Sequence, residues 1–307
     1  MTRIAFPEHL TCERVARPQQ TLARPAVFQG RSLFHGFDVT ATILPADSST
    51  GIVFRRTDLS DVPDIPATVE SLTKVPRRTA LASCKEAVVE TVEHLMAALA
   101  GLQIDNCVVE IDAPELPSYD GSCRDFCDGI LQAGIVQQDE RASLVRISAP
   151  AQVRADDGRQ SLLIRPYAFS CAAITYQLHY GSRSPLEAQT FSAELSPEYF
   201  YEHISAARTF VLESEIAALK KLGYGRHLTA KDIVVVDDDG THRNSLRWPD
   251  EAARHKLLDC LGDLALCGSG FAGHVTACRS GHHLNQELAG LLFSLKQKSL
   301  DENRQAA

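Results

Sequence analysis

One histidine and two aspartates recur at steps of four in the segment EAARHKLLDCLGDLALCG, residues 251–268. If this segment is a helix, His255, Asp259 and Asp263 lie on one face, because side chains four apart stack above one another. Its leucines form a separate apolar stripe. An imidazole and a carboxylate at this spacing can bind one metal ion, but they can equally pair with each other on a solvated surface. The spacing alone leaves both interpretations open.

A catalytic zinc ion typically takes three protein ligands and leaves a fourth position for water, so the metal interpretation requires another ligand. Glu93 and His94 are adjacent in the otherwise apolar segment TVEHLMAALAG. Burying such a pair without partners would cost several kcal/mol, so we expect it to have a partner. His282 and His283 follow a glycine in CRSGHHLNQELAG. A lone histidine is more typical of a structural residue, and it is the combination that favours a metal site.

Helices and strands must bring these distant segments together. The segment 85–102, KEAVVETVEHLMAALAGL, predicts a helix that ends at Gly101. Pro249, followed by two acidic residues, predicts that a second helix begins near residue 249. Alternating apolar residues predict strands in FDVTATILPA, GIVFRRTD and NCVVEI. The order of elements begins again in the second half of the chain, which predicts an α+β fold of two similar layers.

Domain boundaries are suggested by polar and aperiodic stretches. Residues 1–15 have no periodicity, and we expect a loose terminus there. The polar segment QQDERAS predicts a boundary near residue 142. The chain would then have one α+β domain over residues 16–142 and another over residues 143–307.

Composition excludes several classes of protein. The chain has 307 residues, is 44% hydrophobic and carries a formal charge of −8, which argues for a sizeable core and against a nucleic-acid surface. No apolar run approaches the roughly 20 residues of a membrane span, and no secretion signal is visible, so we expect a cytoplasmic protein. The nine cysteines lie mostly in apolar contexts, which favours reduced thiols. Cys123 and Cys127 lack the spacing of a zinc site.

Several segments, in order, resemble the zinc-dependent UDP-3-O-acyl-N-acetylglucosamine deacetylases, which commit a nucleotide sugar to lipid A synthesis. The likeness covers about residues 20–298, and the segments that carry it are GIVFRRTD, VEHLMAALAGLQIDN, DAPELPSYDGS, ARTF, RHKLLDCLGDL and SGHHLN. The resemblance implies a two-domain sandwich. Each domain would have a mainly antiparallel sheet, the helices would pack between the domains, and the site would lie there too.

Carried over by position, the resemblance implies a role for each site residue. It implies that His94, His255 and Asp259 bind Zn2+, and that Glu93 is the general base that activates the attacking water. The remaining roles fall into two groups. Charge that develops in the reaction would be stabilised by Thr209 and by His282, which Asp263 would orient. The substrate would be bound by Lys256, Phe210 and Leu33.

Two segments depart from the family pattern. In GRSLFHG, Phe34 stands where the family has histidine, and His35 follows one position late. In LGYGRHLTAKD, the charged residues Arg226, His227 and Lys231 fall where the family builds an apolar passage for the acyl chain. The chain is therefore expected to be a divergent homologue that acts, as a monomer, on a small sugar substrate.

The sequence leaves one alternative substrate and two less favoured alternative functions. The enzyme could act on another N-acetylated sugar that lacks the acyl chain. A non-catalytic zinc- or sugar-binding protein is disfavoured, because a structural metal needs no Glu93, Thr209, His282 or Asp263. A cysteine hydrolase is disfavoured too, because no cysteine lies in a recognisably electropositive, accessible setting.

Overall fold

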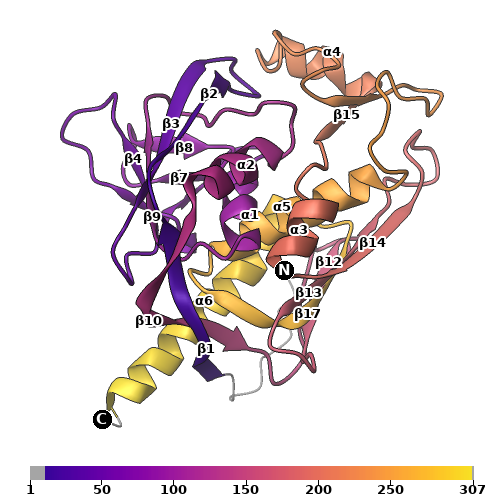
Figure 1. Ribbon diagram of the computed structural model, residues 1–307. Helices are drawn as coiled ribbons and strands as arrows, with labels where there is room; N and C mark the ends of the chain where they lie inside the picture. Colours follow the sequence, from indigo (N-terminus) through magenta and orange to yellow (C-terminus); the bar gives the residue numbers. More distant parts are fainter. Residues whose placement is uncertain (1–10, 306–307) are drawn as a thin grey trace.

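Two β-sheets flank the central helices in the computed structural model, which describes residues 11–305 (Figure 1). The first sheet has the order β2-β3-β9-β4-β5. Its strands are β2 (Ala26–Arg31), β3 (Asp38–Pro45), β9 (Cys107–Ile111), β4 (Ile52–Arg56) and β5 (Ile65–Pro66). All its pairings are antiparallel except that of β4 with β9. Alternate residues of β3 are buried, as expected for a sheet with one face on the core.

The second sheet has seven strands, in the path β1-β10-β17-β12-β11 with β13 and β14 beside β17. The strands are β1 (Thr11–Leu22), β10 (Ile135–Arg146), β11 (Ala151–Arg154), β12 (Ser161–Arg165), β13 (Ala172–Leu178), β14 (Gln189–Glu194) and β17 (Gly270–Cys278). Only the pairings of β17 with β10 and with β13 are parallel. Both large sheets are thus mainly antiparallel, which confirms the predicted α+β class.

Smaller elements lie near the ends of the central helices. The 3-10 helix η1 (Val69–Ser71) leads into a three-stranded sheet of β6 (Leu72–Thr73), β7 (Ala80–Ala82) and β8 (Val88–Glu90). A separate parallel pair, β15 (Phe210–Leu212) and β16 (Val234–Val236), is connected through α4 (Glu213–Lys221). This unit lies at the top of Figure 1.

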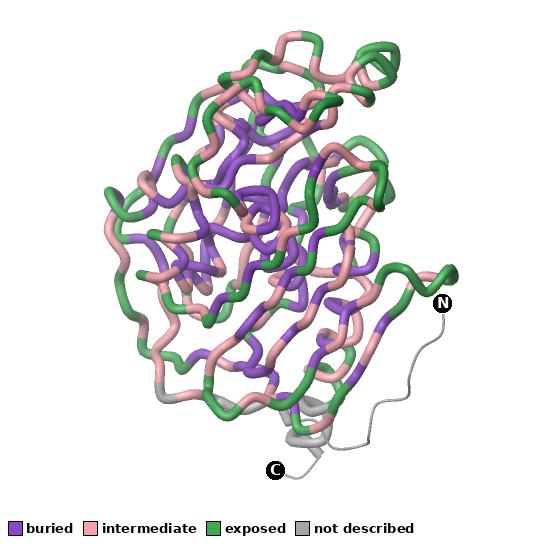
Figure 2. The backbone as a smooth tube through the Cα atoms, turned by 90° about the vertical axis from the view of Figure 1, so that its right-hand side faces the viewer, coloured by how far each residue is buried: buried purple, intermediate pink, exposed green. Residues whose placement is uncertain are grey.

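Helices fill the space between the two sheets (Figure 1). They are α1 (Glu93–Gly101), α2 (Arg124–Ala133), α3 (Pro197–His203), α5 (Glu251–Ala265) and α6 (His282–Gln305). Buried residues concentrate in this interior (Figure 2). None of the helices within residues 11–305 is both long and apolar enough to cross a bilayer.

The two central helices, α1 and α5, touch through a glycine. A Cβ atom placed on Gly262 would lie 2.0 Å from the backbone oxygen of Glu93. Only glycine permits this approach, because real Cβ contacts are not so short. The backbones of α1 and α5 therefore meet where Glu93 begins α1.

The predicted helix over residues 85–102 is wrong in its first part. Residues 88–90 form β8, which pairs with β7, and the helix begins only at Glu93. Thr91 separates the two elements, because its φ of 58° is left-handed, a conformation that β-branched residues rarely adopt. Pairing with β7 thus determines the structure of Val88 and Val89, whose apolar spacing also suits a helix.

Two expectations about chain organisation differ from the structure. Residues 11–14, expected to be loose, belong to β1 and pair with residues 143–146; residues 1–10 lie outside the described part. The expected boundary at residue 142 falls inside β10, which pairs with β1 and β17. The polar side chains of QQDERAS are mostly exposed while its backbone pairs with β1, so the segment is a strand and not a linker. The division into two domains stays a prediction.

Candidate metal centre

Three potential metal ligands converge between α1 and α5. His94 comes from the first turn of α1, and His255 and Asp259 lie one turn apart on α5. Asp259 Oδ1 is 3.3 Å from His255 Nε2 and 3.5 Å from His94 Nε2. Among the side chains that the structure describes, this is the only group of three or more His, Cys, Asp or Glu residues arranged closely enough to share one ion.

The unsatisfied oxygen of Asp259 fits a metal ion. All three side chains are buried, and Asp259 Oδ1 has no hydrogen-bond partner among the residues that the structure describes. A buried acceptor without a partner is unfavourable unless something else compensates it. Ligand atoms around a tetrahedral ion with bonds of about 2 Å lie about 3.3 Å apart, which matches both separations.

Protonation states at the centre suit metal binding. Burial lowers the pKa of His255 to about 4, so its ring is neutral near pH 7. Its Nδ1 lies 3.0 Å from the backbone oxygen of Ala207, which leaves Nε2 to face Asp259. Burial opposes ionisation of Asp259, but His255 and Lys256 outweigh it and hold the pKa of that carboxyl well below its usual range. Lys256 Nζ donates to Asp259 Oδ2 at 2.6 Å.

Glu93 and His282 face each other beside these ligands. Glu93 Oε1 is 3.9 Å from His282 Nε2, which is also 3.9 Å from Asp259 Oδ2. Burial raises the pKa of Glu93, as suits a general base. Burial also acts to lower the pKa of His282, but Asp263 outweighs it and raises that pKa to about 9.

Asp263 lies one turn after Asp259 on the same face of α5, and it pairs with His282. Asp263 Oδ2 lies 2.9 Å from His282 Nδ1 and accepts from Asn285 Nδ2 at 2.8 Å. Its Oδ1 accepts from the hydroxyl of Thr79 at 2.5 Å. Sequence reasoning missed Thr79 and Asn285. Asn285 could have been suspected from its helical spacing to His282, but nothing in the sequence marks Thr79.

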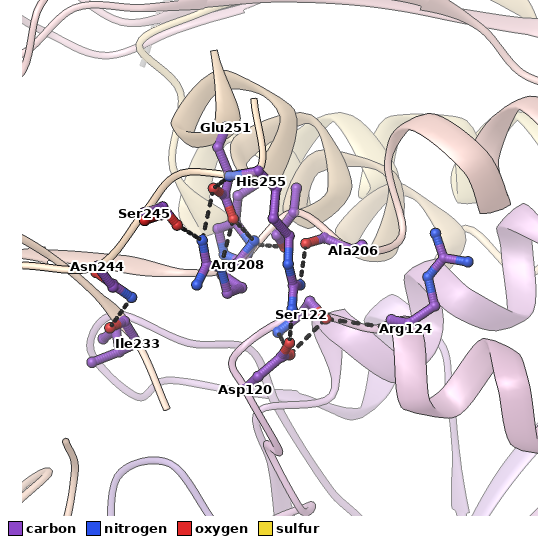
Figure 3. A network of polar contacts seen from close by, with 12 residues as sticks. Asp120, Ser122, Arg124, Ala206, Arg208, Ile233, Asn244, Ser245, Glu251 and His255 are labelled. Carbon is purple, nitrogen blue, oxygen red and sulfur yellow. Dashed lines mark hydrogen bonds and ion pairs between the residues drawn. The ribbon is translucent and has the colours of Figure 1, made fainter. Parts of the chain in front are cut away.

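The segment that carries Thr209 is attached to the start of α5 by a buried ion pair (Figure 3). Arg208 Nε donates to Glu251 Oε1 at 2.7 Å, one turn before His255. Arg208 also donates to the backbone oxygen of Ser245 at 2.8 Å, as Figure 3 shows. Thr209 follows directly, so this pair fixes its position relative to α5.

The predicted substrate-binding residues lie in different settings. Lys256 lies at the centre, where it bonds to Asp259. Phe210 begins β15, and the centroid of its ring is 6.0 Å from that of Tyr180. Leu33 is buried in the bend after β2. Their contacts with substrate stay predictions.

The two segments expected to depart from the family pattern, residues 30–36 and 222–232, contact each other. Gly225 N donates to the backbone oxygen of Phe34 at 2.8 Å, and the ring of Tyr224 packs edge-on against Phe34. Of the three residues expected to bring charge to an apolar passage, Arg226 and Lys231 are exposed, whereas His227 is half-buried. The loop after β2 and the segment 222–232 therefore pack against each other.

The buried guanidinium of Arg78 supports this contact. It lies 4.2 Å from the centre of the Phe34 ring and pairs with Glu90 at 2.7 Å.

Comparisons with known proteins identify a family. Residues 19–294 match the family model for UDP-3-O-acyl N-acetylglycosamine deacetylase. Three curated relatives are named UDP-3-O-acyl-N-acetylglucosamine deacetylase. That of Chlamydia abortus is 37% identical over 92% of this chain and 99% of its own length. The relative from Myxococcus xanthus is 38% identical over 90% of this chain and 86% of its own length. The relative from Geotalea uraniireducens is 36% identical over 90% of this chain and 88% of its own length. The chain therefore belongs to the UDP-3-O-acyl N-acetylglycosamine deacetylase family.

Proposed function

We propose that this chain hydrolyses the acetamide of UDP-3-O-acyl-N-acetylglucosamine, releasing acetate and the free amine, at a zinc centre formed by His94, His255 and Asp259. The observation that carries the proposal is the buried, unpartnered Asp259 Oδ1 that faces two imidazole nitrogens. The printed names of the relatives supply the substrate.

A zinc ion in this position would make a bound water more acidic and polarise the acetamide carbonyl. Glu93, whose raised pKa makes it a stronger base, takes the proton of the attacking water through Oε1. As the C–N bond breaks, cationic His282 donates a proton to the leaving amine. Thr209 donates a hydrogen bond to the oxyanion, and Lys256, Phe210 and Leu33 hold the substrate.

Glu93→Gln tests the base. The variant keeps the size and most hydrogen bonds of the side chain, so it should bind zinc as wild type does. Turnover should fall by about 10²- to 10⁴-fold, the usual contribution of a positioned base. The rate of amide hydrolysis and the zinc content are both measured on the same protein preparation. Unchanged turnover would exclude Glu93 as the base.

The second candidate substrate is an N-acetylated sugar without the acyl chain. The expected departures from the family pattern in residues 30–36 and 222–232 favour it, whereas the exposed positions of Arg226 and Lys231 weaken that argument. Comparing kcat/KM for the acylated nucleotide sugar and its unacylated counterpart decides between them. A preference for the unacylated sugar would replace the proposed substrate and leave the reaction intact. The cytoplasmic location and the monomeric state stay predictions.

A further inference from the structure

Thr79 donates hydrogen bonds to two carboxylates of the centre, those of Glu93 and Asp263. Its backbone N–H donates to Glu93 Oε2 at 3.0 Å, and its hydroxyl donates to Asp263 Oδ1 at 2.5 Å. Thr79 is fully buried and directly precedes β7, so it belongs to neither helix of the centre. One residue thus contacts the proposed base and the carboxylate behind the proposed acid.

The direction of the hydroxyl bond follows from the groups around that oxygen, which besides Asp263 are Gln286 and, at 3.4 Å, His282 Nδ1. Gln286 Nε2 donates to Thr79 Oγ1 at 2.9 Å and so occupies a lone pair of that oxygen. A hydroxyl has one proton, and an ionised carboxylate only accepts, so the proton of Thr79 points at Asp263 Oδ1. The same carboxylate accepts from Asn285 and His282 through Oδ2. Without the hydroxyl, Asp263 Oδ1 would lose this donor in a fully buried position.

The backbone bond distinguishes the two oxygens of Glu93. Because Oε2 accepts from Thr79 N, Oε1 is the oxygen that faces His282 Nε2. The carbonyl of Thr79 also accepts from Val92 N at 3.2 Å, just before Glu93 starts α1. The segment around Thr79 therefore fixes both the carboxylate of Glu93 and the backbone that carries it.

We propose that Thr79 is a positioning residue of the deacetylation reaction: its N–H orients Glu93 so that Oε1 takes the proton, and its hydroxyl holds Asp263, and through it His282, in line with the leaving amine. This inference rests on the proposed function. Thr79 touches neither substrate nor metal ligand in this scheme, so it acts on turnover and not on zinc binding.

Thr79→Val and Thr79→Ser test the hydroxyl, since both keep the backbone N–H. In Thr79→Val, kcat should fall about 10- to 100-fold, the usual effect of losing such a supporting contact, with KM and zinc content close to wild type. Thr79→Ser should restore most of kcat. Thr79→Ala must show the same loss as Thr79→Val, which keeps the test valid if the valine variant does not fold.

Thr21→Val is the matched control. Thr21 lies in β1 and is also buried, and its hydroxyl donates to the backbone oxygen of Asn106 at 2.7 Å. The kcat of Thr21→Val should equal that of wild type. Wild-type kcat in both Thr79→Val and Thr79→Ala, an equal loss in Thr79→Ser, or a loss explained by KM or by missing zinc would each overturn the inference. Absence of hydrolysis by the wild-type zinc enzyme would instead overturn the proposed function.

Discussion

Burial and neighbouring charges together determine the protonation states of the residues at the centre. Burial makes His255 a neutral ligand by lowering its pKa to about 4, and it raises the pKa of Glu93. At Asp259 and His282 neighbouring charges outweigh burial: the pKa of Asp259 is held low, and the adjacent Asp263 raises the pKa of His282 to about 9. Two histidines within one centre thus differ in charge near pH 7. This difference suits one of them to bind a metal and the other to donate a proton.

The pH dependence of the reaction should report His282. Activity requires its protonated form, so kcat/KM should fall as pH rises through about 9. Asp263→Asn removes the anion that raises this pKa and leaves burial, which lowers it, so the alkaline limb should move to lower pH. Profiles of kcat/KM against pH for both proteins measure the shift. An alkaline limb at the same pH in the variant would assign it to another group.

At the scale of elements, the contact of α1 with α5 brings the ligands together. His94 is on one helix and both other ligands are on the other, so the distance between these helices sets the size of the centre. Gly262 permits the approach at the backbone of Glu93, the residue before His94. A glycine inside a helix is normally unfavourable by roughly 1 kcal/mol relative to alanine, which close packing explains here.

Gly262→Ala should separate α1 from α5. The added methyl group would lie 2.0 Å from the backbone oxygen of Glu93, which cannot move as a flexible side chain would. We expect the free energy of unfolding to fall by about 1–3 kcal/mol or more, with weaker zinc binding. Denaturant unfolding and metal competition measure the two effects.

Gly290→Ala in α6 is the control for this substitution. A Cβ atom at Gly290 would meet no atom of the described residues within 4 Å, so the change should be neutral or stabilise by up to about 1 kcal/mol. Equal behaviour of the two variants would show that the contact at Gly262 does not hold the helices together.

At the scale of the whole molecule, a bound ion would connect segments that lie far apart along the chain. α1 lies in the first third of the sequence and α5 near its end, and both pack between the two large sheets (Figure 1). An ion that binds only the folded arrangement stabilises it by mass action.

Removal of the metal should therefore affect activity and stability together. Chelation should abolish deacetylation, and zinc should restore it. At a free zinc concentration about 1,000 times Kd, the folded protein should gain about 4 kcal/mol over the metal-free form. Calorimetry with and without zinc measures the gain, and His94→Ala should show much less of it. Chelator-resistant activity would contradict the proposed metal centre.

The sequence by itself determined whatever depends on neighbours along a helix or on the order of motifs. The alignment of His255, Asp259 and Asp263 on one helix face follows from their four-residue spacing. The start of α5 is predicted near Pro249, and the helix begins at Glu251. The family was evident from many segments in order and is confirmed by the comparisons. These features are local or additive, so no knowledge of packing was needed.

Only the tertiary structure decided what lies between distant segments. It brings His94 to Asp259, places Thr79 between Glu93 and Asp263, and joins the two departing segments at Phe34 and Tyr224. It also makes a strand of residues 88–90 and continues β10 through the expected boundary. In each case the partner lies far along the chain. Local propensity cannot specify such contacts, because packing and strand pairing across the whole molecule select them.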